Sequence, residues 1–134
     1  MAVESTLNQQ MPRVLSVFRI IVGLLFLAHG TSKFLGVPPW TFGPVNAFSL
    51  VWFQGLIEVI GGGLLALGLF TRPVAFTLCG DMTVAYFMTQ APKSFFPHAN
   101  GGLPAVLYCF SFLLLIFAGG GAWSLDRAVR KSAD

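Results

Sequence analysis

The chain has 134 residues, of which 55% are hydrophobic and only 10% charged, and its mean hydropathy is +0.76. A soluble domain carries about 25% charged residues, so this chain has too little charge to cover a surface that faces water. Its net charge of +3 comes from Lys and Arg residues scattered at the ends of apolar segments, which excludes the dense basic stripe of a nucleic-acid-binding protein. Lipid is therefore the expected solvent for most of the chain.

Four long apolar stretches are predicted to be membrane-spanning helices, because a helix needs ~20 mostly apolar residues to cross a bilayer. The first is preceded by a polar segment, and Pro12 suits the first turn of its helix. The predicted spans run over about 14–35, 50–70, 73–88 and 103–118. The sequence thus predicts an all-α, polytopic membrane protein, an antiparallel four-helix transmembrane bundle that occupies the single domain 1–134.

The connections between these spans carry turn and interface signals. The longest, residues 36–49, is rich in Pro and holds Trp40, which is expected to lie at the membrane interface. The turn 71–73 is short, which makes the second and third helices antiparallel neighbours. The loop 91–102 contains Asn100 and His98, which are expected to cap loop backbone.

The C-terminal segment after the last span begins with three glycines, 119–121, which are expected to end that helix. Ser124 then suits the N-cap of a short amphipathic helix, and Asp126 falls in its first turn.

Basic residues mark one set of segment ends, namely Arg13, Arg72, Arg127, Arg130 and Lys131. Only Lys33 and Lys93 lie near the other ends. By the positive-inside rule both termini are predicted to be cytoplasmic, in a multi-pass protein of the inner or plasma membrane. A cleaved signal peptide is disfavoured, because the first apolar run is too long and contains Arg19.

The two cysteines, Cys79 and Cys109, lie inside predicted spans. Counting 1.5 Å per residue places each ~9 Å from an opposite face, so in a ~30 Å core they would differ in depth by ~12 Å. That separation is too large for a disulfide, and two buried small hydrophobes are expected instead.

Ionisable residues inside the spans are more informative than the apolar residues around them, since a charge at that depth faces a partner or a wet cavity. Depth counting predicts an inner and an outer layer. In the inner layer, Arg19 lies ~8 Å from the cytoplasmic face and Asp81 ~12 Å, so they are predicted to form a structural ion pair.

The outer layer is predicted to hold the functional site. Glu58 and His29 are the candidate catalytic residues, and Lys33, His29, Glu58 and Tyr108 are the candidate ligand-binding residues. A set of structural ion pairs that locks the helices in register is the alternative. The glycines 61–63 leave room for a flat ring or allow two helices to touch. No metal-type Cys/His cluster is present in the sequence, so no metal site is predicted.

These motifs, in this order, resemble the DoxX family of small four-helix membrane proteins. The similar pieces are Arg19-x3-Gly23-x5-His29-Gly30-x2-Lys33, Glu58-x2-Gly61-Gly62 followed by Gly68 and Thr71-Arg72, Asp81-Met82, and the tail Gly119-Gly120-Gly121-Ala122-Trp123-Ser124-Leu125-Asp126.

The resemblance implies an oxidoreductase-like membrane subunit, because some relatives look like parts of a thiosulfate–quinone oxidoreductase. One hypothesis is a redox-linked subunit that binds a quinone or a small sulfur oxyanion at the outer layer, with no covalently bound cofactor. The other is a non-catalytic scaffold or assembly partner of a soluble redox enzyme, docked through the tail 124–131. Whether the chain acts as an enzyme stays open, as does a homo-oligomer.

Overall fold

The computed structural model describes residues 1–41 and 43–133, and helices account for most of them. Phe42, in the expected interfacial loop, and the side chain of Lys131, in the expected docking tail, lie outside the described part of the chain. The elements in order are α1 (Ala2–Leu35), α2 (Leu50–Leu67), α3 (Thr71–Ala85), the π-helical turn η1 (Tyr86–Gln90), α4 (Pro97–Asn100), α5 (Leu103–Ala118) and α6 (Leu125–Ala133).

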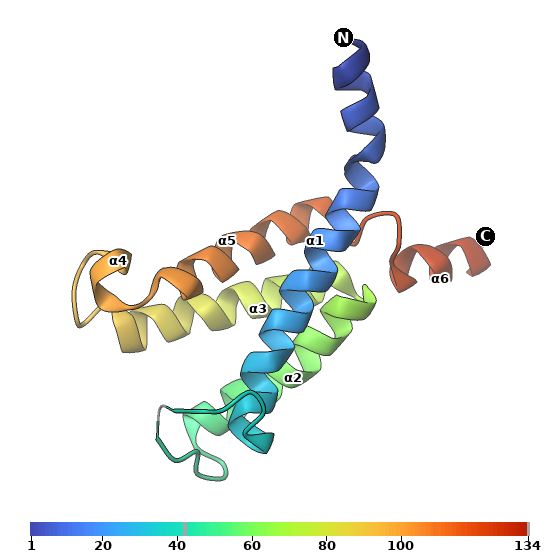
Figure 1. Cartoon of the computed structure of the whole chain (residues 1–134). Coiled ribbons are helices and arrows are strands. Elements are labelled where there is room, and N and C mark those ends of the chain that lie inside the picture. The colour runs from blue at the N-terminus through green and yellow to red at the C-terminus, as the bar shows by residue number, and fades with distance from the viewer. Residues whose placement is uncertain (42, 134) are drawn as a thin grey trace.

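The long helices form two pairs, α1 with α2 and α3 with α5, and contacts within a pair outnumber those between pairs. Figure 1 shows the two pairs diverging from a junction near α6, one toward α4 and the other toward the connection 36–49. We call this junction the α6 end of the molecule. The expected antiparallel neighbours α2 and α3 are joined there by a short turn.

Close backbone approach holds α1 against α2. A Cβ added at Gly23 would lie 2.7 Å from a backbone nitrogen of α2, and one added at Gly62 would lie 2.7 Å from the backbone nitrogen of Leu27. At Gly61 the side chain of Leu78 fills the space. These glycines therefore serve helix packing, as small residues do in membrane helices, rather than leaving room for a ring.

The core lies where the four long helices meet. Its fully buried side chains include Phe26, Leu65, Leu78, Phe112 and Leu115. Most other large apolar side chains on these helices are exposed, among them Ile21, Ile60, Phe76, Phe110 and Phe117. A surface this apolar on every long helix is what contact with lipid requires.

Helix α1 is longer than expected. It begins at Ala2, so Pro12 lies inside the helix and not in its first turn. The carbonyl of Pro12 accepts hydrogen bonds from the Ser16 hydroxyl and from the backbone of Ala122, which tie this part of α1 to the segment after α5. Helices α1 and α2 are long and apolar enough to cross a membrane, whereas α5 is a shorter apolar helix.

Candidate functional site

Lys33 of α1 and Glu58 of α2 form a buried ion pair. The Lys33 Nζ donates to Glu58 Oε2 at 2.7 Å and to Gln54 Oε1 at 3.4 Å. The two side chains are only 5% and 2% exposed. It is the one ion pair among the described residues, and it joins two of the charged residues that the sequence analysis assigned to the outer layer.

The local sequence explains how the lysine reaches its partner. Lys33 lies in the last turn of α1, where a cation is favoured by the helix dipole, and Gly36 ends the helix in the left-handed conformation. Its aliphatic stem passes over Gly55, where an added Cβ would lie 3.1 Å from Lys33 Cδ. The missing side chain at Gly55 thus leaves the path to Glu58 open.

Asp81 of α3 completes the charge arrangement. It interacts electrostatically with Lys33 and with Glu58, and its buried Oδ2 has no hydrogen-bond partner among the described residues. The ammonium group of Lys33 therefore bonds one carboxyl group and interacts electrostatically with a second one from another helix. We call Lys33, Glu58 and Asp81 the central cluster.

His29 and Tyr108 lie beside this cluster as an aromatic pair. Their ring centroids are 5.5 Å apart in an edge-to-face arrangement, and Phe26 packs against both rings. Electrostatic interactions link His29 to Lys33 and Tyr108 to Glu58. The four outer-layer candidates and Asp81 are thus brought together from α1, α2, α3 and α5.

Arg19 does not pair with Asp81 within the described part of the chain. Its side chain, 1% exposed, donates from Nη1 to the Gly120 carbonyl at 2.7 Å and from Nη2 to the Trp123 carbonyl at 2.9 Å. The predicted ion pair is therefore wrong. Arg19 packs beside Gly68 at the α6 end, whereas Asp81 lies ten residues beyond the start of α3, about 15 Å deeper.

The glycine-rich segment after α5 docks onto α1 at this same place. Ser16 Oγ donates to the Gly120 carbonyl at 3.1 Å and accepts from the Trp123 backbone at 2.9 Å. The segment does end α5, as expected, but it also supplies the backbone carbonyls that satisfy Arg19. Sequence reasoning missed this role because carbonyl acceptors leave no residue-type signal.

Asp126 of α6 caps the N-terminus of α3. Its two carboxylate oxygens accept from the backbone N–H groups of Phe70 at 2.6 Å and Thr71 at 2.9 Å. Burial disfavours the charged form, but the bonds from Thr71 and Phe70 outweigh it and lower the pKa of Asp126 below its usual value. Ser124 accepts from the backbone of Arg127, which confirms the predicted cap of α6. The Asp126 contact itself was not anticipated.

In the loop before α5, Asn100 caps backbone as expected. Its Oδ1 accepts from Gly102 N at 2.7 Å and its Nδ2 donates to the Ser94 carbonyl at 2.9 Å. His98, the other residue expected to cap there, is exposed in α4.

The two cysteines are in contact. Cys79 Sγ lies 3.5 Å from Cys109 Sγ, across the interface between α3 and α5. The predicted separation in depth is wrong, because it counted the two residues from opposite faces of a ~30 Å core. Helix α5 has only 16 residues, about 24 Å, and both cysteines lie eight or nine residues from the α6 end of their helices.

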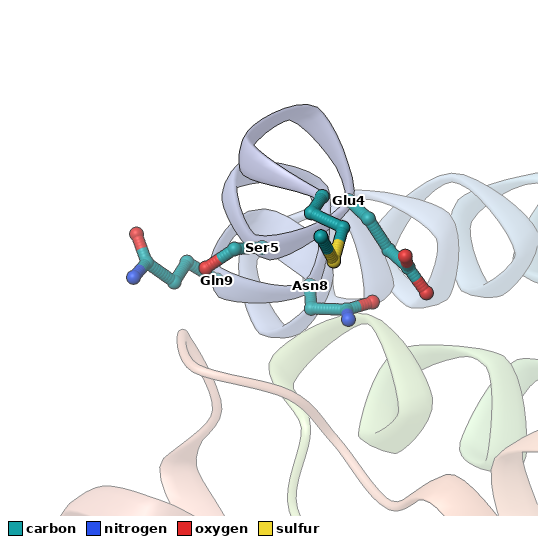
Figure 2. A pocket seen from close by; sticks show the side chains of 5 residues that line it. Glu4, Ser5, Asn8 and Gln9 are labelled. Atoms are coloured by element: carbon teal, nitrogen blue, oxygen red, sulfur yellow. The ribbon is translucent and has the colours of Figure 1, made fainter.

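Two surface depressions lie away from the central cluster. One, at the start of α1, is lined by Met1, Glu4, Ser5, Asn8 and Gln9. Figure 2 shows that Glu4 and Gln9 there point in opposite directions, so these side chains do not converge on a ligand. The other is a groove at the α6 end, bordered by α6, the turn 69–73 and the segment 118–121, with Arg72, Arg127 and Arg130 along it.

An all-helical chain with an apolar surface and charged groups between its helices is a membrane protein by class. The DoxX family model matches residues 14–91, more than half of the chain. The chain belongs to the DoxX family. The match contains four of the five residues gathered at the central cluster and its aromatic pair, and only Tyr108 lies beyond it.

Three proteins are similar to this chain over most of its length. An uncharacterized protein of Haemophilus influenzae is 42% identical over 132 residues, which cover 95% of this chain and 98% of the relative. A membrane protein of Mycobacterium tuberculosis is 29% identical, covering 95% and 88%. A Bacillus subtilis protein, CatD, named as a candidate oxidoreductase, is 30% identical, covering 75% and 70%. No solved structure matches the chain.

Proposed function

We propose that α1, α2, α3 with η1, and α5 all cross the inner or plasma membrane, with both termini in the cytoplasm. The support is the apolar exposed surface of these helices and the arginines gathered along the groove at the α6 end. Reporter fusions at each terminus test this topology. A cytoplasmic signal is expected from both, and an extracytoplasmic signal from the C-terminal fusion would contradict it.

We further propose that the chain is a redox-linked membrane subunit that binds a quinone at the central cluster. The observation that carries this proposal is the buried Lys33–Glu58 pair at 2.7 Å, together with Asp81, which interacts electrostatically with Lys33 and whose buried Oδ2 has no hydrogen-bond partner among the described residues. Carboxyl groups next to an ammonium group can hold and release protons, which quinone reduction consumes. The oxidoreductase name of the relative CatD agrees with this class of function.

The charges of the central cluster favour a neutral quinone over a sulfur oxyanion. Lys33 is already neutralised by Glu58, and Asp81 adds a second carboxyl group. An incoming anion would meet two carboxyl groups and one cation, so binding it would bring like charges together in a place of low dielectric. A quinone brings no charge, and its carbonyl oxygens accept hydrogen bonds.

The aromatic pair supplies the remaining recognition. His29 is exposed on the described surface and has its ring edge-to-face with Tyr108, which comes from the other helical pair. A flat ring stacks on such side chains, and the imidazole and phenol groups offer donors to its carbonyls. We assign His29 and Glu58 as the candidate proton-transfer residues and Lys33 and Tyr108 as candidate ligand-binding residues.

Thermal unfolding of the lipid-supplemented protein, with ubiquinone and menaquinone analogues, thiosulfate and sulfite, tests the proposal. A quinone is expected to raise the unfolding temperature of the parent and of Lys93→Met, an exposed control, but not of Glu58→Gln. Stabilisation by thiosulfate or sulfite alone would replace the quinone with an oxyanion. No response to any ligand would remove the binding proposal.

A second candidate function is a non-catalytic scaffold, favoured by the groove at the α6 end. Three arginines line that groove, so its partner would be an acidic surface of a soluble redox enzyme. Co-purification of partners with the parent and with an Arg127→Glu/Arg130→Glu variant tests this function. A partner lost from the variant would support the scaffold. The same partners with both proteins would contradict docking in this groove.

A further inference from the structure

The cysteines are the only two in the chain, and they come from different helices to a single point of contact. Their Sγ atoms are 3.5 Å apart, about 1.5 Å more than the length of a disulfide bond. The Cys109 Sγ also lies 3.8 Å from the backbone carbonyl oxygen of Cys79, so it contacts both the sulfur and the backbone of that residue. Both are half-buried at the edge of the core.

We infer that Cys79 and Cys109 are a reversible dithiol–disulfide centre, the two-electron carrier of this protein. This inference rests on the proposed function for its oxidant, a membrane quinone. The two S–H bonds break and one S–S bond forms, and the two electrons and two protons pass to the quinone carbonyls to form a hydroquinone. A thiol reductant of the cell would return the centre to the dithiol.

The surroundings of the sulfurs suit this chemistry. The Thr83 hydroxyl lies 3.4 Å from Cys109 Sγ and hydrogen bonds to the Cys79 carbonyl at 2.9 Å, so a hydroxyl is in place to accept and relay a thiol proton. Along the same two helices, Cys79 precedes Asp81 by two residues and Cys109 follows Tyr108 directly. Asp81 and Tyr108 therefore lie within about 3 Å of the two cysteines along the helix axes, so the dithiol is at nearly the same level of the bundle as these two groups.

Two structural roles for the contact predict different behaviour. Two small core residues would touch but resist oxidation, as buried thiols in tight packing do. A permanent disulfide would form and then withstand reduction by glutathione. In a redox centre the dithiol must be oxidised and the disulfide must be reduced again. The dithiol must also be oxidised by a quinone as well as by a simple oxidant.

The test uses the full chain in lipid nanodiscs. After treatment the protein is denatured, and its free thiols are counted by labelling with a maleimide that adds a known mass to each. Because the chain has two cysteines, the reduced protein takes two tags and the oxidised monomer takes none. We expect diamide and a ubiquinone analogue each to oxidise both thiols, so that neither is tagged. Glutathione is expected to reduce the disulfide, so that both are tagged again. The variants Cys79→Ser and Cys109→Ser should each keep one tag under quinone.

The outcomes separate this inference from the proposed function. Glu58→Gln should lose both tags with diamide as fast as the parent, which shows that the α3–α5 interface is intact, but oxidise about a hundredfold more slowly with quinone. Retention of both tags under diamide in the parent would overturn the redox centre and leave the quinone site standing. Oxidation by diamide but not by quinone, in a sample that quinone stabilises, would also overturn it. An oxidised protein that glutathione leaves untagged would show a structural disulfide instead.

Discussion

Two buried cations on α1, Arg19 and Lys33, are satisfied in opposite ways. Arg19 faces neutral carbonyls of the segment after α5, whereas Lys33 faces the carboxylate of Glu58. Carbonyl partners hold a charge without titrating, so the Arg19 contact has one state and serves structure. A carboxylate partner can take up a proton, and with Asp81 nearby the Lys33 contact has several states. The comparison separates a charge held by neutral carbonyls at the α6 end from a charge held by a titratable carboxyl group in the middle of the molecule.

The largest effect is expected from breaking the Lys33–Glu58 pair on one side. Lys33→Met leaves the Glu58 carboxylate buried without its cation, which should lower the free energy of unfolding by about 3–5 kcal/mol. The double variant Lys33→Met/Glu58→Gln should recover most of this loss. Thermal unfolding in detergent measures both. A double variant as unstable as the single one would show that the loss is not electrostatic.

A smaller loss is expected at the structural end. Arg19→Leu removes the cation together with its two hydrogen bonds to Gly120 and Trp123, so no unpaired charge stays buried; it should cost about 1.5–3 kcal/mol and release the segment after α5. Hydrogen exchange of the 119–126 amides should rise. Arg13→Leu is the matched control, because Arg13 is exposed and its one hydrogen bond among the described residues is to Gln10. Equal exchange in the two variants would contradict the assigned role of Arg19.

Helix packing gives the third prediction. Gly23→Ala puts a methyl group against the backbone of α2 and should cost about 1–3 kcal/mol. Gly63→Ala has nothing within 4 Å of its new Cβ and should instead stabilise the helix by up to about 1 kcal/mol. Unfolding temperatures of the two variants decide the question. The same change at both sites would mean that α1 and α2 do not approach as closely as described.

The smallest effect is expected at the cap of α3. Asp126→Asn should cost about 1 kcal/mol, because the weaker amide acceptor replaces a carboxylate at Phe70 and Thr71. The folded protein lowers the pKa of Asp126, so its stabilisation is present above the ordinary carboxyl value of 3.8 and is lost as the pH falls below it. Parent and variant should therefore differ in unfolding temperature at pH 7, and the difference should shrink as the pH falls below 3.8. A constant difference across this range would exclude the carboxylate as the cause.

The sequence by itself determined the helical class, the apolar segments and the presence of ionisable residues inside them. The length of an apolar segment and the presence of a charge inside it can be read from the sequence, so they need no tertiary structure. The Lys33–Glu58 association and the cap at Ser124 were also predictable, since helix periodicity and local spacing bring those groups into place.

Only the tertiary structure decided which charges and thiols meet. Depth counting assumes straight helices that begin at the membrane face, yet α1 begins at Ala2 and α5 has only 16 residues. The predicted Arg19–Asp81 pair was therefore wrong, and the two cysteines, predicted to lie apart, are in contact. The partners of Arg19 are backbone carbonyls, which every residue carries and no sequence pattern marks. Contacts between helices depend on where each helix starts, ends and crosses its neighbour, and those quantities arise only when all the helices pack together.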